Sequence, residues 1–334
     1  MGRRRINWAR RILSWSFLFC FAMYIVIIIT TFFMNNEEGV RRELAREMID
    51  DQPPTIELIG GDSMTIAVGD TFVEPGFTVY DTRSVPTVEV EDLVDVKRPG
   101  EYEISYRAND ANENVAEAKR KVKVIEPAGR IYLTFDDGPG DYTATLLDIL
   151  AKYNIKATFF VTGYGDDALI KREYDEGHTV GLHTNSHIYS YLYSSIDNYM
   201  TDLNAVRDRV YNITGKKTKM LRFPGGSSNL ISAHYDGGIH IMTSLVELLS
   251  DQNYTYFDWN VDSGDAGGAD SSEQIYNNVV SALKWGGDSI VLQHDIKPHS
   301  VEAVEKIIQY GLENNFVFSK LTSDSFNAHH GINN

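Results

Sequence analysis

The sequence predicts an α/β fold whose parallel sheet is either open or closed into a barrel, preceded by a small all-β sandwich and one N-terminal transmembrane helix. Three observations predict this order. Residues 12–34 are apolar, short alternating segments divided by turns fill residues 54–126, and strand-like segments alternate with helix-like ones from residue 130 onward. A length of 334 residues fits two domains and a tail.

The apolar stretch at residues 12–34 is long enough to cross a bilayer core of about 30 Å. A cleavable signal peptide would have an apolar region of roughly 7–15 residues followed by small residues. This stretch is longer and ends in Thr-Thr-Phe-Phe-Met. Arginines precede it and acids follow it, so residues 1–11 are expected in the cytoplasm and everything after residue 35 outside the cell. We therefore expect a single-pass protein of the cell membrane.

The charge balance excludes one class of partner. The formal net charge is −16, and it becomes −21 from residue 35 onward, because five of the 31 basic residues and none of the 47 acidic ones precede that position. Such an acidic surface repels nucleic acid and anionic polymers.

Cys20 is the only cysteine in the sequence, so an intrachain disulfide is excluded. No obligate protein partner is evident.

The segment that follows the anchor has two parts. Residues 35–53 are charged, end before Pro54, and predict a solvated stalk. In residues 54–126, Gly, Pro and Asn-Asp turns divide short alternating segments, which predicts a small antiparallel sandwich suited to a spacer or to weak wall binding. The expected strands are 55–59, 64–68, 77–80, 102–108 and 119–125.

Strand–helix units fill the rest of the chain. The expected strands are 131–135, 156–161, 179–182, 219–223, 254–260, 288–293 and 315–318. The expected helices are 142–153, 166–176, 194–212, 239–252, 271–284 and 299–313. Repetition of this unit predicts a parallel sheet, open or closed into a barrel. In a barrel, catalytic residues belong at the C-terminal ends of the strands.

Two adjacent carboxylates, Asp136 and Asp137, follow the apolar strand 131–135 and precede Gly138-Pro139. Neighbouring side chains on a strand point to opposite faces, which is awkward in a core. The arrangement is reasonable if the two carboxylates have different tasks at the mouth of a pocket. The alternative is an acidic turn that caps the next helix.

His183 and His187 follow the strand 179–182. A spacing of four places both imidazoles on one side of a helical turn, which is typical of a zinc site. A third ligand must come from elsewhere in the chain, and an aspartate would suit. The alternative is a polar loop with two exposed histidines.

Three further polar groups also follow predicted strands. Arg222 precedes a Pro-Gly-Gly bend, and an arginine there can pair with a carboxylate while the bend exposes backbone N–H groups. Asp262 and Asp265 follow the strand 254–260, and His294 follows the strand 288–293. A histidine close to a carboxylate is a good general acid. Because all five groups fall at C-terminal strand ends, we expect them to form one site.

The domain from about residue 130 to 325 resembles the NodB-homology polysaccharide deacetylases, carbohydrate esterase family four. The family's five motifs appear in order as Thr-Phe-Asp-Asp-Gly-Pro (134–139), His-Thr-Asn-Ser-His (183–187), Arg-Phe-Pro-Gly-Gly (222–226), Asp-Ser-Gly-Asp (262–265) and Leu-Gln-His (292–294). Residues 68–77 and 97–114 similarly resemble bacterial immunoglobulin-like surface modules.

The resemblance implies a distorted (β/α) barrel over residues 127–326, with 327–334 as a tail. It implies that Asp137, His183 and His187 bind one divalent metal ion, usually Zn²⁺, with Co²⁺ and Mn²⁺ as alternatives. It also implies that the backbone N–H of Gly225 binds the oxyanion and that Leu292 lines the pocket for the acetyl methyl group.

The resemblance further implies the acid–base groups. Asp136 would be the base with Arg222 as its partner, and His294 would be the acid, tuned by Asp265. Whether Asp262 or Asp265 orients His294 stays open at this point. The six other histidines fit no role and are expected in loops or at the surface: His178, His234, His240, His299, His329 and His330.

Two positions depart from the family's motifs. Gly225 stands where an aromatic residue is common, and Ala266 stands where tryptophan usually follows the aspartate. Both changes are expected to widen the groove and to affect the choice of substrate more than the chemistry.

The expected function is metal-dependent hydrolytic N-deacetylation of an N-acetylated surface glycan, with the N-acetylglucosamine or N-acetylmuramic acid residues of peptidoglycan as the expected substrate. One alternative is a deacetylase or esterase acting on another polysaccharide, such as poly-N-acetylglucosamine, chitin or acetylxylan. The other is a non-catalytic glycan-binding protein. The complete set of metal ligands, base and acid favours an enzyme.

Overall fold

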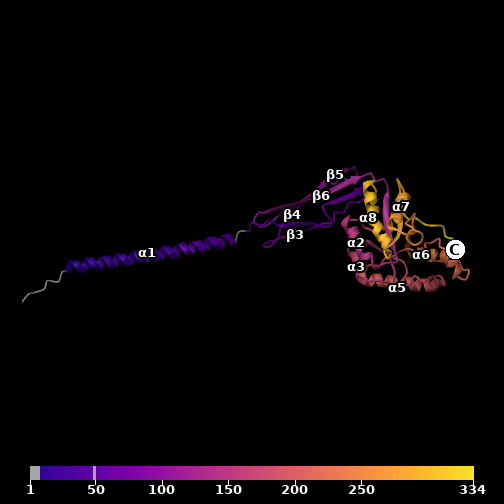
Figure 1. Ribbon diagram of the computed structural model, residues 1–334, viewed down its shortest axis with the longest axis horizontal. Coiled ribbons are helices and arrows are strands. Elements are labelled where there is room, and N and C mark those ends of the chain that lie inside the picture. Colours follow the sequence, from indigo (N-terminus) through magenta and orange to yellow (C-terminus); the bar gives the residue numbers. More distant parts are fainter. Residues whose placement is uncertain (1–7, 48–49) are drawn as a thin grey trace, which may run out of the picture. The chain divides into compact units, whose positions relative to one another are not determined.

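The N-terminal part of the chain is one long helix. The computed structural model describes residues 8–47 and 50–334, and α1 (Trp8–Glu47) is drawn in indigo in Figure 1. Its segment Phe19–Arg42 is long and apolar enough to cross a membrane. The helix continues beyond the predicted span, so the segment predicted as a stalk is helical as far as Glu47. Residues 48 and 49 of that segment lie outside the described residues.

The immunoglobulin-like module contains two sheets. β1 (Thr55–Leu58) pairs with β3 (Phe77–Tyr80), and a second sheet has the order β2-β6-β5-β4. The strands of the second sheet are β2 (Ser63–Ala67), β4 (Thr87–Asp92), β5 (Gly100–Asn109) and β6 (Val115–Ile125). The sequence analysis did not predict β4.

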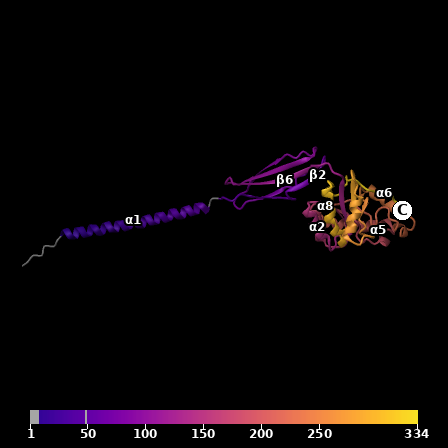
Figure 2. The ribbon, with the colours of Figure 1, turned by 45° about the horizontal axis from the view of Figure 1, so that its top comes forward.

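The prediction of a purely antiparallel sandwich was wrong. β2 pairs with β6 in parallel, with Ser63 opposite Lys121 and Ala67 opposite Ile125 (Figure 2). Parallel neighbours need a long connection, and here three intervening strands supply it. An alternating sequence pattern reports which face of a strand is buried and contains no information on the direction of its neighbour.

A curled parallel sheet forms the core of the second domain. Its strand order is β11-β10-β9-β8-β7-β13-β12, and β14 (Val317–Phe318) pairs with the start of β7 (Arg130–Asp136). The remaining strands are β8 (Thr158–Val161), β9 (Thr179–Leu182), β10 (Met220–Leu221), β11 (Thr255–Tyr256), β12 (Val261–Asp262) and β13 (Asp288–His294). β11 and β12 are the two free edges, so the distorted barrel predicted from the family resemblance is confirmed in an open form.

Six helices cover the outer face of this sheet. Successive contacts run α6-α5-α3-α2-α8-α7, and Figure 1 shows α7 and α8 side by side. Their bounds are α2 (Thr143–Lys152), α3 (Asp167–Asp175), α5 (Ile196–Thr214), α6 (Ile241–Asp251), α7 (Ser272–Ala282) and α8 (Pro298–Glu313). All six were predicted to within two residues at each end. Two short helices, α4 (Tyr189–Leu192) and the 3₁₀ turn Ser232–His234, were not predicted.

Strand alternation decides which face of the sheet carries the polar residues. Ile131, Leu133 and Phe135 of β7 join the large core under the helices. Tyr132 belongs to a second cluster on the opposite face, together with Phe160, Phe257, Ile290, Leu321 and Ala328. Because side chains alternate along a strand, Asp136 lies on the same face as Tyr132, at the end of β7.

One of the six histidines without an expected role lies in a loop, as expected, but not at the surface. His178 is buried, and its Nδ1 accepts a hydrogen bond from the backbone N–H of Ala157 at 3.0 Å. Its ring also packs edge-on against Phe159. A single histidine before a strand gives no sequence signal that separates a core position from a loop position.

Candidate active site

The five motifs meet at the C-terminal edge of the sheet. Asp136 ends β7, and His294 ends β13 directly opposite it in the parallel register. His183 follows β9, and Arg222 follows β10. Because the strands run in parallel, residues as far apart in the chain as Asp136 and His294, 158 positions, converge on one edge. Asp265 follows β12 and reaches the same place.

Asp137, His183 and His187 form a set of donors that fits a divalent cation. Oδ1 of Asp137 lies 3.5 Å from Nε2 of His183 and 3.4 Å from Nε2 of His187. One donor atom of each residue lies within 4.8 Å of the other two. Oδ1 of Asp137 is buried and has no hydrogen-bond partner among the described residues. One carboxylate oxygen and two imidazole nitrogens are the donors of a catalytic zinc site that keeps an open position.

The backbone of Arg222 orients one of these histidines. Nδ1 of His183 lies 2.8 Å from the carbonyl oxygen of Arg222. A carbonyl can only accept, so Nδ1 is the protonated nitrogen and Nε2 presents its lone pair to Asp137 and His187. Burial lowers the pKa of His183, which keeps the imidazole neutral, the form that binds a cation.

Two of the three candidate ligands have a strained backbone. Asp137 has φ = 72° and His187 has φ = 54°, values in the left-handed region that non-glycine residues rarely adopt. Strain of this kind costs on the order of 1–3 kcal/mol per residue and persists where surrounding structure enforces it, often at functional sites.

Arg222 and Asp136 form a buried ion pair. Nη1 of Arg222 donates to Oδ1 of Asp136 at 2.9 Å and to Oγ1 of Thr134 at 2.7 Å. Its Nε and Nη2 donate to the backbone carbonyls of Phe257 and Asp258, both at 3.0 Å. The arginine is fully buried, and each of its three guanidinium nitrogens donates at least one of these hydrogen bonds.

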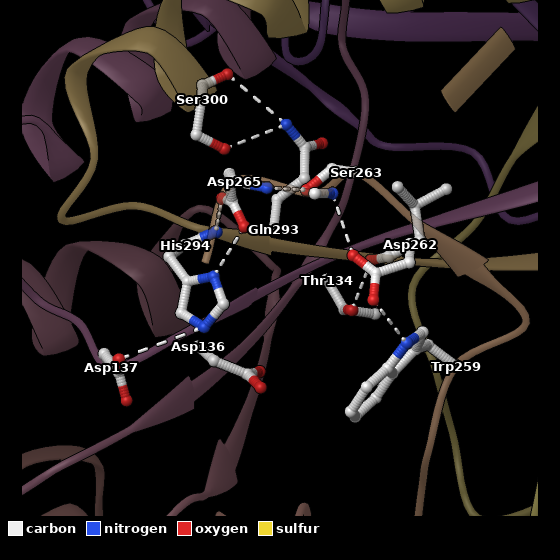
Figure 3. A network of polar contacts seen from close by, with 12 residues as sticks. Thr134, Asp136, Asp137, Trp259, Asp262, Ser263, Asp265, Gln293, His294 and Ser300 are labelled. Carbon is white, nitrogen blue, oxygen red and sulfur yellow. Dashed lines mark hydrogen bonds and ion pairs between the residues drawn. The ribbon is translucent and has the colours of Figure 1, made fainter. Parts of the chain in front are cut away.

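His294 is held by Asp265. Nδ1 of His294 lies 2.8 Å from Oδ1 of Asp265, and Oδ2 of Asp265 accepts the backbone N–H of His294 at 2.7 Å (Figure 3). Burial acts to lower the pKa of His294, but the hydrogen bond and the charge of Asp265 outweigh it and raise the pKa to about 9. Burial acts to raise the pKa of Asp265, yet its bonds to His294 lower it overall, so the carboxylate stays ionised.

Asp262 does not contact His294. Its Oδ2 accepts from the indole Nε1 of Trp259 at 3.3 Å, and its Oδ1 accepts from the backbone N–H of Gly264 at 2.8 Å (Figure 3). The geometry therefore selects Asp265, which the family resemblance also indicates, as the neighbour of His294. The free end of the imidazole points the other way, and its Nε2 lies 3.9 Å from Oδ2 of Asp137.

The loop that carries Gly225 is anchored by a residue that the sequence analysis missed. Oδ1 of Asp258 accepts the backbone N–H of Ser227 at 2.8 Å, and Oδ2 accepts the hydroxyl of Ser227 at 2.5 Å and the backbone N–H of His330 at 2.9 Å. Asp258 is fully buried. Gly225 has φ = 76°, and its N–H has no acceptor within the part of the chain that the structure describes.

Tyr189 and Asn229 lie beside Gly225. A Cβ built at Gly225 would lie 3.4 Å from the hydroxyl oxygen of Tyr189 and 3.2 Å from Cβ of Asn229. The ring of Tyr189 also packs against His187, with centroids 5.2 Å apart. Leu292 is buried, as a pocket-lining residue would be, whereas Ala266 lies in an exposed turn. Tyr189 follows His187 by two residues, so its place in the sequence could have indicated it.

Comparison with known proteins identifies the two domains. A family model described as polysaccharide deacetylase matches residues 123–235, and one described as bacterial surface protein, Ig-like domain, matches residues 56–124. The peptidoglycan-N-acetylglucosamine deacetylase of Bacillus cereus is 33% identical over 204 residues, which are 58% of this chain and 70% of the relative.

The chain belongs to the polysaccharide deacetylase family. Solved structures of polysaccharide deacetylases agree with this assignment. The catalytic domain of peptidoglycan N-acetylglucosamine deacetylase from Eubacterium rectale is 48% identical, with 61% of this chain and 94% of that one covered and a TM-score of 0.60. A polysaccharide deacetylase from Bacillus cereus is 33% identical, with 60% and 95% covered and a TM-score of 0.52. This polysaccharide deacetylase is accordingly a hydrolase, carried on a chain with an immunoglobulin-like module.

Proposed function

We propose that the protein is a metal-dependent N-deacetylase of peptidoglycan, anchored in the cell membrane by α1 with its catalytic domain outside. One observation carries the proposal. Oδ1 of Asp137 has no hydrogen-bond partner among the described residues and lies beside Nε2 of His183 and His187, while Nε2 of His294 lies 3.9 Å from the other oxygen of the same carboxylate. In this proposal residues 54–126 are a spacer module and residues 127–326 are the catalytic domain.

Asp136 is the base in this proposal. Its Oδ1 is engaged by Arg222, so Oδ2 is the oxygen that takes the proton from the attacking water. The guanidinium fixes the carboxylate in one orientation. A general base must combine the correct protonation state with hydrogen-bond reach of the proton that it removes.

His294 is the acid. Because Nδ1 is bound to Asp265, the second proton of the imidazolium is on Nε2, which faces Asp137 and the open part of the site. With a pKa of about 9 the ring is protonated at neutral pH. It therefore delivers a proton to the amide nitrogen as the carbon–nitrogen bond breaks, and acetate and a free amine are released.

Asp137, His183 and His187 would hold the metal ion, which when bound supplies a Lewis acid that polarises the acetamide carbonyl. The N–H of Gly225 is free to donate to the oxygen on which negative charge develops.

The choice of peptidoglycan rests on the relatives. Proteins described as peptidoglycan-N-acetylglucosamine deacetylase and as peptidoglycan-N-acetylmuramic acid deacetylase are both similar to this chain. Chitin deacetylases are also similar, at 31% and 33% identity, so a chitin-like polymer is the second candidate substrate.

Acetate release by the full-length protein in detergent tests the proposal. We expect activity on peptidoglycan above that on chitooligosaccharides or acetylxylan, loss of activity with a chelator, and recovery with Zn²⁺, Co²⁺ or Mn²⁺. The Asp136→Asn variant, assayed at equal metal content, is the control for contaminating esterases. Undiminished activity in metal-free protein would overturn the metal dependence. Activity on acetylxylan alone would overturn the substrate.

A further inference from the structure

We infer that the immunoglobulin-like module contains a calcium site formed by Asp50, Asp81 and Asp110. One carboxylate oxygen of each residue lies within 4.8 Å of the other two. Calcium binds oxygens at about 2.3–2.6 Å, so two ligands on opposite sides of one ion lie about 4.6–5.2 Å apart. The three carboxylates are therefore close enough to share a single cation.

Asp50 has a buried carboxylate oxygen with no hydrogen-bond partner among the described residues, and this indicates a cation ligand. Asp50 is only 6% exposed, and its Oδ2 is buried with no hydrogen-bond partner in the described part of the chain. Its Oδ1 has one long contact, 3.3 Å from the backbone N–H of Gln52. A buried carboxylate oxygen without a partner is costly, and a cation shared with the neighbouring carboxylates removes that cost.

The other two carboxylates are fixed before a cation arrives. Oδ1 of Asp81 accepts the backbone N–H groups of Arg83 and Ser84, at 2.8 and 2.6 Å. Oδ1 of Asp110 accepts the N–H groups of Asn112 and Asn114, both at 2.8 Å.

The three residues come from separate connections of the module. Asp81 follows β3, Asp110 follows β5, and Asp50 precedes β1. Two bonds join these connections: Nδ2 of Asn114 donates to the carbonyl of Asp50 at 2.9 Å, and the N–H of Ala111 donates to Oγ of Ser84 at 3.3 Å. A cation bound here would fasten the start of the module to two of its turns.

The donor chemistry selects the kind of ion. Residues 50–125 contain neither histidine nor cysteine, the ligands that zinc and copper favour. Carboxylates, backbone carbonyls and water suit calcium, which tolerates an irregular set of six to eight oxygens, better than magnesium, which demands a near-ideal octahedron. Extracellular calcium sites bind the ion with dissociation constants of about 10⁻⁴–10⁻³ M.

Calcium titration of the full-length protein tests this site separately from the catalytic one. The protein is purified in detergent, stripped with chelator and reloaded with one equivalent of Zn²⁺. Isothermal titration with Ca²⁺ is expected to show one further ion per chain and a higher melting temperature. Tb³⁺ provides a second readout, because excitation of the nearby Tyr80 would sensitise its emission and Ca²⁺ would displace it.

Asp81→Asn is the main variant, since its Oδ1 can still accept both backbone N–H groups and preserve the turn. It is expected to weaken Ca²⁺ binding by about tenfold or more, as is Asp50→Asn. The matched control is Asp92→Asn, an exposed aspartate that also caps a turn, at Val94. Asp137→Ala removes any Tb³⁺ signal from the catalytic site. The inference is overturned if Ca²⁺ gives no heat and no shift, if Asp92→Asn weakens binding equally, or if Mg²⁺ binds as tightly as Ca²⁺.

Discussion

Nη1 of Arg222 lies 2.9 Å from Oδ1 of Asp136, and neither side chain is more than 4% exposed. Removing one partner from a buried pair leaves an uncompensated charge and costs about 3–5 kcal/mol. Arg222 also satisfies Thr134 and two backbone carbonyls, so the cost is not electrostatic alone. Arg222 therefore stabilises the fold in addition to holding Asp136, the proposed base.

Replacing Arg222 with lysine tests that double role. The charge is kept, but an ammonium group cannot reach two carbonyls, a hydroxyl and a carboxylate together. We expect the stability of the barrel to fall by about 3 kcal/mol, followed by fluorescence of Trp259 and Trp285 during urea unfolding. Arg207→Lys, at a partly exposed arginine paired with Asp208, is the control and should change stability little. Equal effects of the two substitutions would contradict this account.

The adjacent carboxylates should separate metal binding from catalysis. Asp136→Asn is expected to keep the metal content, measured by elemental analysis, and to lower turnover by about 10²–10⁴-fold, because the group that takes the proton is lost. Asp137→Asn is expected to lose both metal and activity, since its Oδ1 has no other partner among the described residues. If Asp136→Asn is the variant that loses the metal, the two roles are reversed.

The pH profile reports on His294 and Asp265. The acid must be protonated, so activity falls as the pH rises through the pKa of His294, which Asp265 holds at about 9 against an ordinary value of 6.5. Asp265→Asn removes the negative charge. The alkaline limb of kcat/KM should therefore move toward lower pH, and activity at neutral pH should fall. Asp262→Asn, whose carboxylate contacts Trp259, should leave the alkaline limb in place. An unshifted limb in Asp265→Asn would remove His294 as the acid.

His178 makes stability depend on pH at a distance from the active site. Burial, aided by Lys156, lowers its pKa to about 3, so the folded state holds it neutral while the unfolded state takes up a proton near 6.5. Its contribution is therefore fully present above 6.5 and is lost as the pH falls toward 3, with a limiting slope of about 1.4 kcal/mol per pH unit.

In His178→Gln this component of the pH dependence should disappear. The free energy of unfolding, measured by urea denaturation between pH 4 and 7, should lose less on acidification than it does in the native sequence. His299→Gln is the control, because His299 is exposed and pairs only with Glu302 in the described part of the chain. Parallel curves for the native sequence and His178→Gln would show that His178 is protonated in the folded state.

Tyr189 should act on substrate binding. Its hydroxyl lies 3.4 Å from the position of a Cβ at Gly225, where the family commonly has an aromatic residue. Tyr189→Ala should raise KM for short chitooligosaccharides by about 10- to 100-fold, the value of roughly 1–3 kcal/mol of lost contact, with a smaller change in kcat. Tyr191→Ala, an exposed position in the same short helix, is the matched control. A larger effect on kcat than on KM would assign Tyr189 to the chemistry.

The sequence predicted most of the fold because its elements are long and periodic. The apolar run along β7 and the apolar faces of α2 and α8 are local properties, and the structure confirms all three. The segment 254–260 was different: only Thr255 and Tyr256 form a strand there, and β12 begins at Val261. Two-residue strands are fixed by their neighbours in the sheet, so a local pattern cannot locate their ends.

The same distinction between local patterns and long-range contacts applies to the site. The motif residues were found because each follows a predicted strand. Asp258 was not found, because its partners Ser227 and His330 are 31 and 72 residues away in the chain. The contact of Asp265 with His294 also depends on how β12 and β13 lie in the sheet, so the sequence could not by itself decide between Asp262 and Asp265.

Arg222 contacts both a candidate metal ligand and the proposed base, through different atoms. Its carbonyl fixes the tautomer of His183, and its side chain holds Asp136. A small movement of this strand end therefore displaces a metal ligand and the base together. An engineer who selects variants for a new metal should expect turnover to change as well, and compensating substitutions should be sought around β10, away from the ligands.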